Sequence, residues 1–192
     1  MCNNCKCGGN ENMKIRVRYL DGAKRMEKTT KGNWIDVYAY EDKFVPENTR
    51  AMINLGFALE LPEGYEGHLA PRSSTFKTWG VIQTNHVGVI DDTYIGDNDI
   101  WHMPVYSLRG DYVMDKITGE ISAIDDVIIN INCHGKDLKQ MFSDKFIFGT
   151  FIQKGDKIGQ FRIMEVMPNF DFVEAESFGH EDRGGFGTSG VK

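Results

Sequence analysis

Apolar side chains occupy every second position between residues 53 and 61, and this alternation constrains the fold more than any other feature. Its members are Ile53, Leu55, Phe57, Leu59 and Leu61, the pattern of a strand that buries one of its faces. Residues 62–64, Pro-Glu-Gly, then indicate a turn. Shorter candidate strands lie near residues 14–19, 34–39, 100–108, 147–152 and 157–167. Because no long segment has helical periodicity, the sequence predicts an all-β sandwich or small barrel.

The length and the charge of the chain limit the classes of protein to which it can belong. The 192 residues suit one domain with an insertion. The formal net charge of −6 disfavours sequence-independent binding of nucleic acid, which needs a basic face, but a few arginines and backbone N–H groups suffice for a nucleotide. The sequence has no apolar run of about 18 residues, as a membrane span needs, and no signal-peptide pattern. We therefore expect a cytoplasmic protein that binds neither nucleic acid nor a membrane.

Three of the four cysteines, Cys2, Cys5 and Cys7, crowd the start of the chain. A disulfide framework spreads its cysteines through the fold, so this cluster does not imply an oxidising compartment. One interpretation of residues 1–12 is a flexible tail, since Asn, Gly and Glu surround the cysteines. The other is a metal site whose fourth ligand comes from Cys133, a histidine or another chain.

Residues 110–149 differ from the rest of the chain. They contain an apolar run at 127–131, after which Leu138, Met141 and Phe142 have helical spacing. We interpret the segment as a small α/β insertion at a hairpin tip, where insertions are well tolerated. Its apolar residues suggest a protein partner, and a passive decoration is the alternative. The barrel would then comprise residues 13–109 and 150–178.

Two segments carry side chains suited to phosphate. Residues 71–74 read Pro-Arg-Ser-Ser, in which Arg72 offers a fixed fork of donors and Ser73 and Ser74 add hydroxyls. Residues 154–161 indicate a turn entering a strand, in which Gln160 alternates with apolar neighbours. Each segment alone also fits an ordinary surface turn or an exposed strand.

A third segment, residues 85–96, combines an amide, two acids, an aromatic ring and glycines. An apolar run leads into Asp91, and a carboxylate at the end of a strand can orient and deprotonate a water molecule. The Asn85 amide has both a donor and an acceptor for the edge of a base. Asp and Gly also favour β-turns for conformational reasons, so this segment alone leaves both interpretations open.

The end of the chain, residues 179–192, is rich in glycine. Glycines let backbone N–H groups approach phosphates closely, and the hydroxyls within residues 185–190 can reinforce this. Phe186 between glycines has no packing role in a free tail, which favours stacking on a ring. We expect a mobile arm that orders on a ligand.

The order of these segments resembles that of the trimeric deoxyuridine triphosphatase (dUTPase) family. Five motifs of that family resemble residues 34–39, 71–74, 88–96, 155–161 and 185–190. The resemblance implies a jelly-roll-like β-barrel, a homotrimer, and active sites that draw motifs from different subunits. It also implies a Mg²⁺-dependent dUTP diphosphatase that cleaves dUTP to dUMP and pyrophosphate, and so supplies dUMP for dTTP synthesis. A compact chain with a long insertion suits a phage or prophage enzyme.

The resemblance implies a role for each site residue. Asp91 orients the water that attacks the α-phosphorus, and Asp36 contacts hydrated Mg²⁺ through water. Asn85 and the backbone at Gly88 read the uracil edge, while Tyr94 packs beneath the deoxyribose. The other substrate-binding residues hold the phosphates or close the arm over uracil: Arg72, Ser73, Ser74, Gln160, Arg183, Phe186, Gly187, Thr188 and Ser189.

The fifth motif is shorter than the family pattern, and two other functions compete. A short deletion keeps Arg183 at the position of the arm's arginine, whereas an ungapped alignment puts Glu181 there. A deoxycytidine triphosphate deaminase shares the implied fold, but its chemistry needs a glutamate beside the base, and residues 85–96 contain none. A non-catalytic nucleotide-binding protein is the second alternative, against which an intact Asp91 argues.

Overall fold

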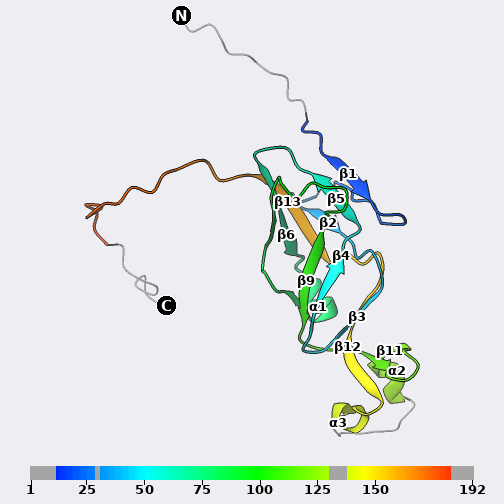
Figure 1. Cartoon of the computed structure of the whole chain (residues 1–192). Helices are drawn as coiled ribbons and strands as arrows, with labels where there is room; N and C mark the ends of the chain where they lie inside the picture. Colours follow the sequence, from blue (N-terminus) through cyan, green and yellow to red (C-terminus); the bar gives the residue numbers. More distant parts are fainter. Residues whose placement is uncertain (1–11, 29–30, 130–137, 183–192) are drawn as a thin grey trace, which may run out of the picture.

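Strands dominate the computed structural model, which describes residues 12–28, 31–129 and 138–182 (Figure 1). The strands are β1 Arg16–Tyr19, β2 Ile35–Val37, β3 Lys43–Pro46, β4 Arg50–Asn54, β5 Phe57–Glu60, β6 Tyr65–Pro71, β7 Val81–Gln83, β8 Gly88–Ile90, β9 His102–Ser107, β10 Tyr112–Asp115, β11 Ile121–Ala123, β12 Phe146–Ile152 and β13 Gly159–Glu165. The helices are short: α1 Thr75–Trp79, α2 Ile124–Ile129 and α3 Leu138–Phe142. This content agrees with the predicted all-β class.

The strands form antiparallel sheets. One sheet has the order β2-β13-β6-β8 and another the order β4-β9-β7, while β1 pairs with β5. A further sheet has the order β11-β10-β12-β3. Strand β6 pairs with β13 along one edge and with β8 along the other. Its position between these strands matters for the site, because the predicted motifs lie on or beside them.

The core is built around three aromatic rings. The side chain of Trp101 is 1% exposed, and its ring centroid lies 5.3 Å from those of both Phe57 and Phe161. Gly67 of β6 faces this cluster so closely that a Cβ atom there would lie 2.3 Å from Trp101 Cη2. Glycine is therefore needed where β6 passes the indole ring.

The alternating apolar run is buried as predicted, but it does not form one strand. Its five members, Ile53, Leu55, Phe57, Leu59 and Leu61, are each at most 4% exposed. Strand β4 ends at Asn54 and pairs with β9, whereas β5 begins at Phe57 and pairs with β1. Gly56 makes the break, because its φ of +74° suits glycine and its N–H donates to Asn54 Oδ1 at 2.8 Å. The prediction of a single strand was therefore wrong.

The described parts of residues 110–149 extend one end of the molecule, where β11, α2 and α3 lie (Figure 1), and they also include β10. Strand β12 pairs with β10 and also with β3, so one sheet continues from the barrel into this segment. The same strand crosses the predicted boundary between residues 149 and 150. Gly110 and Gly149 meet where the segment leaves the barrel, since a Cβ on Gly110 would lie 2.5 Å from Gly149 N.

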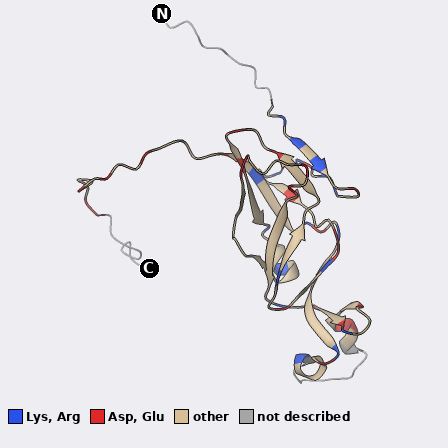
Figure 2. Ribbon diagram, viewed as in Figure 1, with Lys and Arg blue, Asp and Glu red and all other residues tan. Residues whose placement is uncertain are grey.

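The chain after β13 leaves the barrel (Figure 1). Residues 166–182 form neither helix nor strand. Acidic residues recur along this segment (Figure 2). Its exposed large apolar side chains are Val166, Met167, Phe170, Phe172, Val173 and Phe178. Across the described part of the chain, no helix is long and apolar enough to cross a membrane.

Candidate active site

The sheet around β6 carries residues from several predicted motifs. Gly88 of β8 lies opposite Leu69 of β6, and Leu69 also lies opposite Phe161 of β13. One position earlier on β13, Gln160 lies opposite Asp36 of β2. The pairing of β6 with both of its neighbours therefore places segments that are distant in sequence on a single sheet.

A charged cluster of Asp36, Arg72 and Lys157 lies at the end of β6. Arg72 Nε is 2.8 Å from Asp36 Oδ1, and Lys157 Nζ is 3.0 Å from Asp36 Oδ2. The Asp36 carboxylate accepts a hydrogen bond from the Lys157 ammonium and, with its negative charge, raises the pKa of that group. Two cations around one acid leave a positive local balance, which suits a polyanion such as a phosphate chain.

The other predicted phosphate-binding residues lie at the same edge. Gln160 Nε2 donates to Pro71 O at 3.1 Å, and an Arg72 N–H donates to Ser74 Oγ at 3.4 Å. Ser74 is the N-cap residue that precedes α1, yet its side chain makes no capping hydrogen bond to the helix. Ser73 is exposed beside it. The structure therefore brings Asp36, Arg72, Ser73, Ser74 and Gln160 together.

Two residues at this edge of the sheet, Thr75 and Lys157, were not singled out from the sequence. Thr75 is fully buried, and its Oγ1 accepts from the Arg72 backbone N–H at 2.9 Å and donates to Ile158 O at 2.9 Å. It therefore ties the turn after β6 to the start of β13. Lys157 lies inside the motif at residues 155–161, so its charge was the available indication.

The turn between β7 and β8 holds Asn85 and Gly88. Gly88 is buried, and a Cβ there would lie 3.3 Å from Leu69 Cβ and 3.5 Å from Asn85 Nδ2. Asn85 is exposed, and its Oδ1 accepts a hydrogen bond from Gln83 Nε2 at 2.8 Å. Glycine at position 88 therefore lets β8 pack closely against Leu69 of β6, with the Asn85 amide beside it.

Asp91 directly follows β8 and is exposed. Its Oδ1 accepts hydrogen bonds from the Thr93 hydroxyl and from the Thr93 backbone N–H, the latter at 2.9 Å. These bonds, the hydroxyl first, lower the pKa of Asp91 below its ordinary value. Asp91 is therefore a carboxylate near neutral pH. Tyr94 in the same loop is 41% exposed, and its hydroxyl donates to Ile100 O at 3.4 Å.

These residues form two groups that lie apart in one chain. Along β6, Arg72 follows the last residue, Leu69 faces Gly88, and Gly67 faces Ile90, which precedes Asp91. Arg72 and Asp91 therefore flank opposite ends of this strand, about 20 Å apart at the rise of an extended strand. Arg183, Phe186, Gly187, Thr188 and Ser189 lie outside the described residues, as do the four cysteines.

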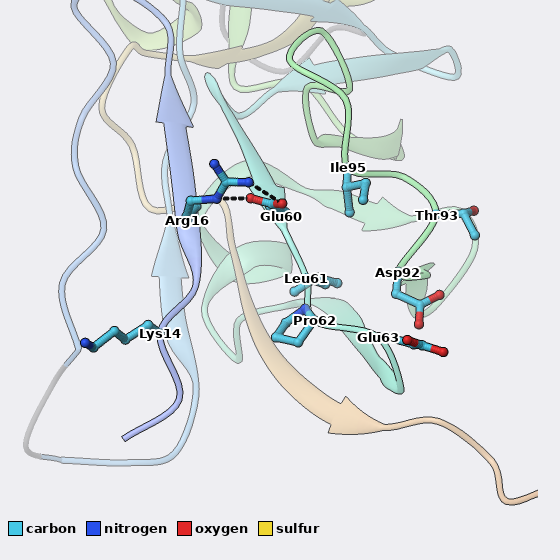
Figure 3. Close-up of a pocket in the computed structure, with 9 residues that line it drawn as sticks. All are labelled: Lys14, Arg16, Glu60, Leu61, Pro62, Glu63, Asp92, Thr93 and Ile95. Atoms are coloured by element: carbon cyan, nitrogen blue, oxygen red, sulfur yellow. Dashed lines mark hydrogen bonds and ion pairs between the residues drawn. The ribbon is translucent and has the colours of Figure 1, made fainter. Parts of the chain in front are cut away.

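A cavity of about 710 Å³ borders the Asp91 loop but not the predicted substrate residues (Figure 3). Its walls include Arg16, Glu60, Asp92 and Thr93, and the Arg16 guanidinium is paired with the neighbouring Glu60 carboxylate on one side of it. Neither Arg72 nor Asn85 lines it. The cavity therefore lies beside the Asp91 loop and away from Arg72 and Asn85.

Comparison with known proteins settles the family. The dUTPase family profile matches residues 27–104. The SPbeta prophage-derived deoxyuridine 5'-triphosphate nucleotidohydrolase YosS of Bacillus subtilis (strain 168) is 41% identical over 94% of this chain and 100% of its own length. The chain belongs to the dUTPase family. A dUTPase of Hydrogenobaculum sp. (strain Y04AAS1), 29% identical, is likewise covered over its full length and matches 94% of the chain.

Solved structures of phage dUTPases share the fold. The dUTPase of Staphylococcus bacteriophage 80alpha with dUPNHPP has a TM-score of 0.65 at 22% identity, covering 94% of this chain and 100% of that one. A mutant dUTPase from phage phi11 of S. aureus, described with a structural Mg(II) ion, has a TM-score of 0.59 at 23% identity, covering 86% of this chain and 99% of that one. The predicted family and all-β dUTPase fold are thus confirmed, and neither alternative function is favoured. The role of each site residue stays a prediction.

Proposed function

We propose that this dUTPase hydrolyses dUTP to dUMP and pyrophosphate, with Asp91 activating the attacking water. The nucleotidohydrolase named above, 41% identical over its whole length, is the observation that carries the reaction. The lowered pKa of Asp91 keeps its carboxylate charged near neutral pH, so that it can orient the attacking water by accepting a hydrogen bond from it. The attack on the α-phosphorus releases pyrophosphate from the opposite side.

The turn and strand from Asn85 to Asp91 suit a deoxynucleoside. The backbone around Gly88 meets the edge of uracil, and the Asn85 amide lies beside it. Asp91 follows Gly88 by three strand residues, about 10 Å at the rise of an extended strand, which is comparable to the span from a base to its first phosphate. Tyr94, partly exposed in the same loop, is placed to pack beneath the deoxyribose.

The separation of Arg72 from Asp91 supports a site shared between chains in a homotrimer. A nucleotide whose base lies at Gly88 and whose α-phosphate lies at Asp91 extends its triphosphate away from the Arg72 of the same chain. The charged cluster of Asp36, Arg72 and Lys157 can therefore reach those phosphates only from another copy. Closed rotational symmetry gives every chain both halves of such a site.

The chain after β13 supplies the remaining part of this proposal. Residues 166–182 leave the barrel and expose apolar side chains, as a segment that packs on another subunit does. The arm at 179–192 would then close over a neighbouring site, where Phe186 stacks on uracil. Arg183, Gly187, Thr188 and Ser189 would reach the phosphates. Closure excludes water other than the nucleophile.

We assign Mg²⁺ to the phosphate chain rather than to a cage of carboxylates. Among the described residues, no group of three or more His, Cys, Asp or Glu side chains is arranged to hold a metal ion. Both oxygens of Asp36 already contact cations, which suits a water-mediated contact better than direct ligation. A bound Mg²⁺ would supply positive charge to the triphosphate, and Asp36 would contact it through water. Asp36 also orients Arg72 and Lys157.

We further propose that residues 110–149 are an accessory unit that hydrolysis does not need. Gly110 lies against the Gly149 backbone, so the barrel is already closed at the base of the segment. A protein partner for this segment and a cytoplasmic location stay predictions.

Pyrophosphate release from dUTP, dCTP, dTTP and UTP tests the proposed reaction. Release from dUTP alone, lost with a chelator and restored by Mg²⁺, is expected. Asp91→Asn should bind dUTP but release pyrophosphate slower by about 10² to 10⁴-fold, the usual contribution of a positioned base. Ammonia release from dCTP would instead indicate a deaminase, and a folded protein inactive on all four nucleotides would indicate a binding protein.

A further inference from the structure

The exposed Asn85 side chain is hydrogen-bonded to a buried amide, that of Gln83. Gln83, the last residue of β7, is 4% exposed. Its Nε2 donates to Leu69 O of β6 at 3.0 Å and to Asn85 Oδ1 at 2.8 Å. A primary amide has two N–H groups on its nitrogen. Both donors of Gln83 are therefore used, one on the backbone of β6 and one on the Asn85 side chain.

These two bonds fix the direction of both amides. Gln83 cannot turn over, because its Oε1 would then face the Leu69 carbonyl, and two acceptors do not bond. Since Gln83 offers a donor, Asn85 must turn its Oδ1 toward Gln83. The Asn85 Nδ2, which lies near Gly88, is then the end that remains for a ligand. An amide that could otherwise present either end thus presents donors alone.

We propose that Gln83 is a positioning residue that sets base selectivity by making Asn85 a hydrogen-bond donor. This inference rests on the proposed function, in which Asn85 reads the base. The pyrimidine edge that meets Asn85 Nδ2 must then carry an acceptor. Uracil has a carbonyl at C4, whereas cytosine has an amino group there, and two donors facing each other leave both unpaired.

The other end of the Gln83 amide faces the interior. Its Oε1 is buried and has no hydrogen-bond partner among the described residues. A buried carbonyl without a donor is costly, so a bound water molecule is expected to supply one. Gln83 therefore acts on the base only through the Asn85 side chain.

Gln83 also joins β7 to β6, two strands of different sheets. A merely structural role would reduce stability on substitution without changing base selectivity. Gln83→Met keeps the length of the side chain and removes its amide. Ser107→Ala is the matched control, because Ser107 is a buried polar residue of β9 whose Oγ donates to Arg109 O at 3.1 Å, outside the base site.

The experiment measures kcat and KM for dUTP and dCTP, with the Tm of each variant. Gln83→Met is expected to lower the ratio of kcat/KM for dUTP over dCTP about tenfold, as loss of one oriented hydrogen bond does, mainly through KM for dUTP. In an Asn85→Ala background the same change should have no further effect on the ratio, because the two residues act as one unit. Ser107→Ala should lower Tm and leave the ratio unchanged.

Asn85→Asp is a second test, at an exposed position where folding is not at risk. Gln83 can still donate to one carboxylate oxygen, so the other presents an acceptor, and the preference should move toward dCTP. An unchanged ratio in folded Gln83→Met, or a full additional loss in the Asn85→Ala background, would overturn the inference. A wild-type chain that releases no pyrophosphate from dUTP would refute the proposed function instead.

Discussion

Replacing Gly67 with alanine should destabilise the barrel through one contact. The new Cβ would lie 2.3 Å from Trp101 Cη2 and 3.0 Å from Cζ2. The indole must then retreat by about 1 Å to reach ordinary van der Waals contact. It has little room to do so, because Trp101 is 1% exposed and packs against Phe57 and Phe161 at centroid distances of 5.3 Å.

Overpacking of this kind costs about 1 to 3 kcal/mol. For a chain of this length, each kcal/mol lowers Tm by roughly 2 to 4 °C. Urea unfolding followed by tryptophan fluorescence measures the loss, at one fixed protein concentration because the stability of an oligomer depends on it. Gly67 faces Ile90, which precedes Asp91, so we also expect kcat to fall.

Trp101→Phe supplies the control, because phenylalanine lacks the ring atoms that the new methyl group would meet. In that background the additional cost of Gly67→Ala should shrink to roughly 0.5 kcal/mol or less, since the two changes share one contact. An equal cost in both backgrounds would refute the reasoning and locate the strain in the backbone of β6.

Three further changes probe the site and the insertion. Thr93→Val removes the hydroxyl that contributes most to the lowered pKa of Asp91. The pKa of Asp91 should therefore rise, and the acidic limb of the pH profile of kcat/KM should move to higher pH. An acidic limb that stays in place would contradict this. Lys157→Gln should raise KM for dUTP roughly two- to fivefold, more at low salt, because the group is partly exposed; an effect independent of salt would argue against a charge contact. Replacing residues 111–148 with a two-residue Asn-Gly turn should leave dUTP hydrolysis intact, and its loss would show that the segment supports the site.

The all-β class and the buried face could be predicted from the sequence, because alternating apolar side chains indicate which face of a strand is buried. Ile53, Leu55 and Phe57 are all buried, as the pattern requires. The sequence did not show that the chain changes partner at Gly56, because a positive φ at a glycine is a backbone property that leaves the alternation unchanged. Strand existence was thus predictable, and strand pairing was not.

The site residues could be predicted from the sequence where their own side chains and near neighbours indicate their role. Arg72 lies beside two hydroxyl side chains, which indicates phosphate binding, and Asp91 lies at the end of a strand, which indicates a role in orienting water. Thr75 and Gln83 carry no such indication, because each acts through a hydrogen bond to a residue distant in sequence, Ile158 and Leu69 respectively. Buried polar residues of this kind look ordinary in a sequence, and only the pairing of strands reveals what they hold.

Complementation between two inactive variants tests the shared active site most directly. Asp91→Asn keeps the charged cluster, and Arg72→Ala keeps the catalytic carboxylate, so each variant alone should release almost no pyrophosphate from dUTP. Assembled together in equal amounts, they should regain about a quarter of the wild-type activity, the share of intact sites expected from random mixing around a symmetric ring. Mixed assemblies that stay as inactive as the separate variants would show that Asp91 and Arg72 serve the same chain, contrary to the proposed site.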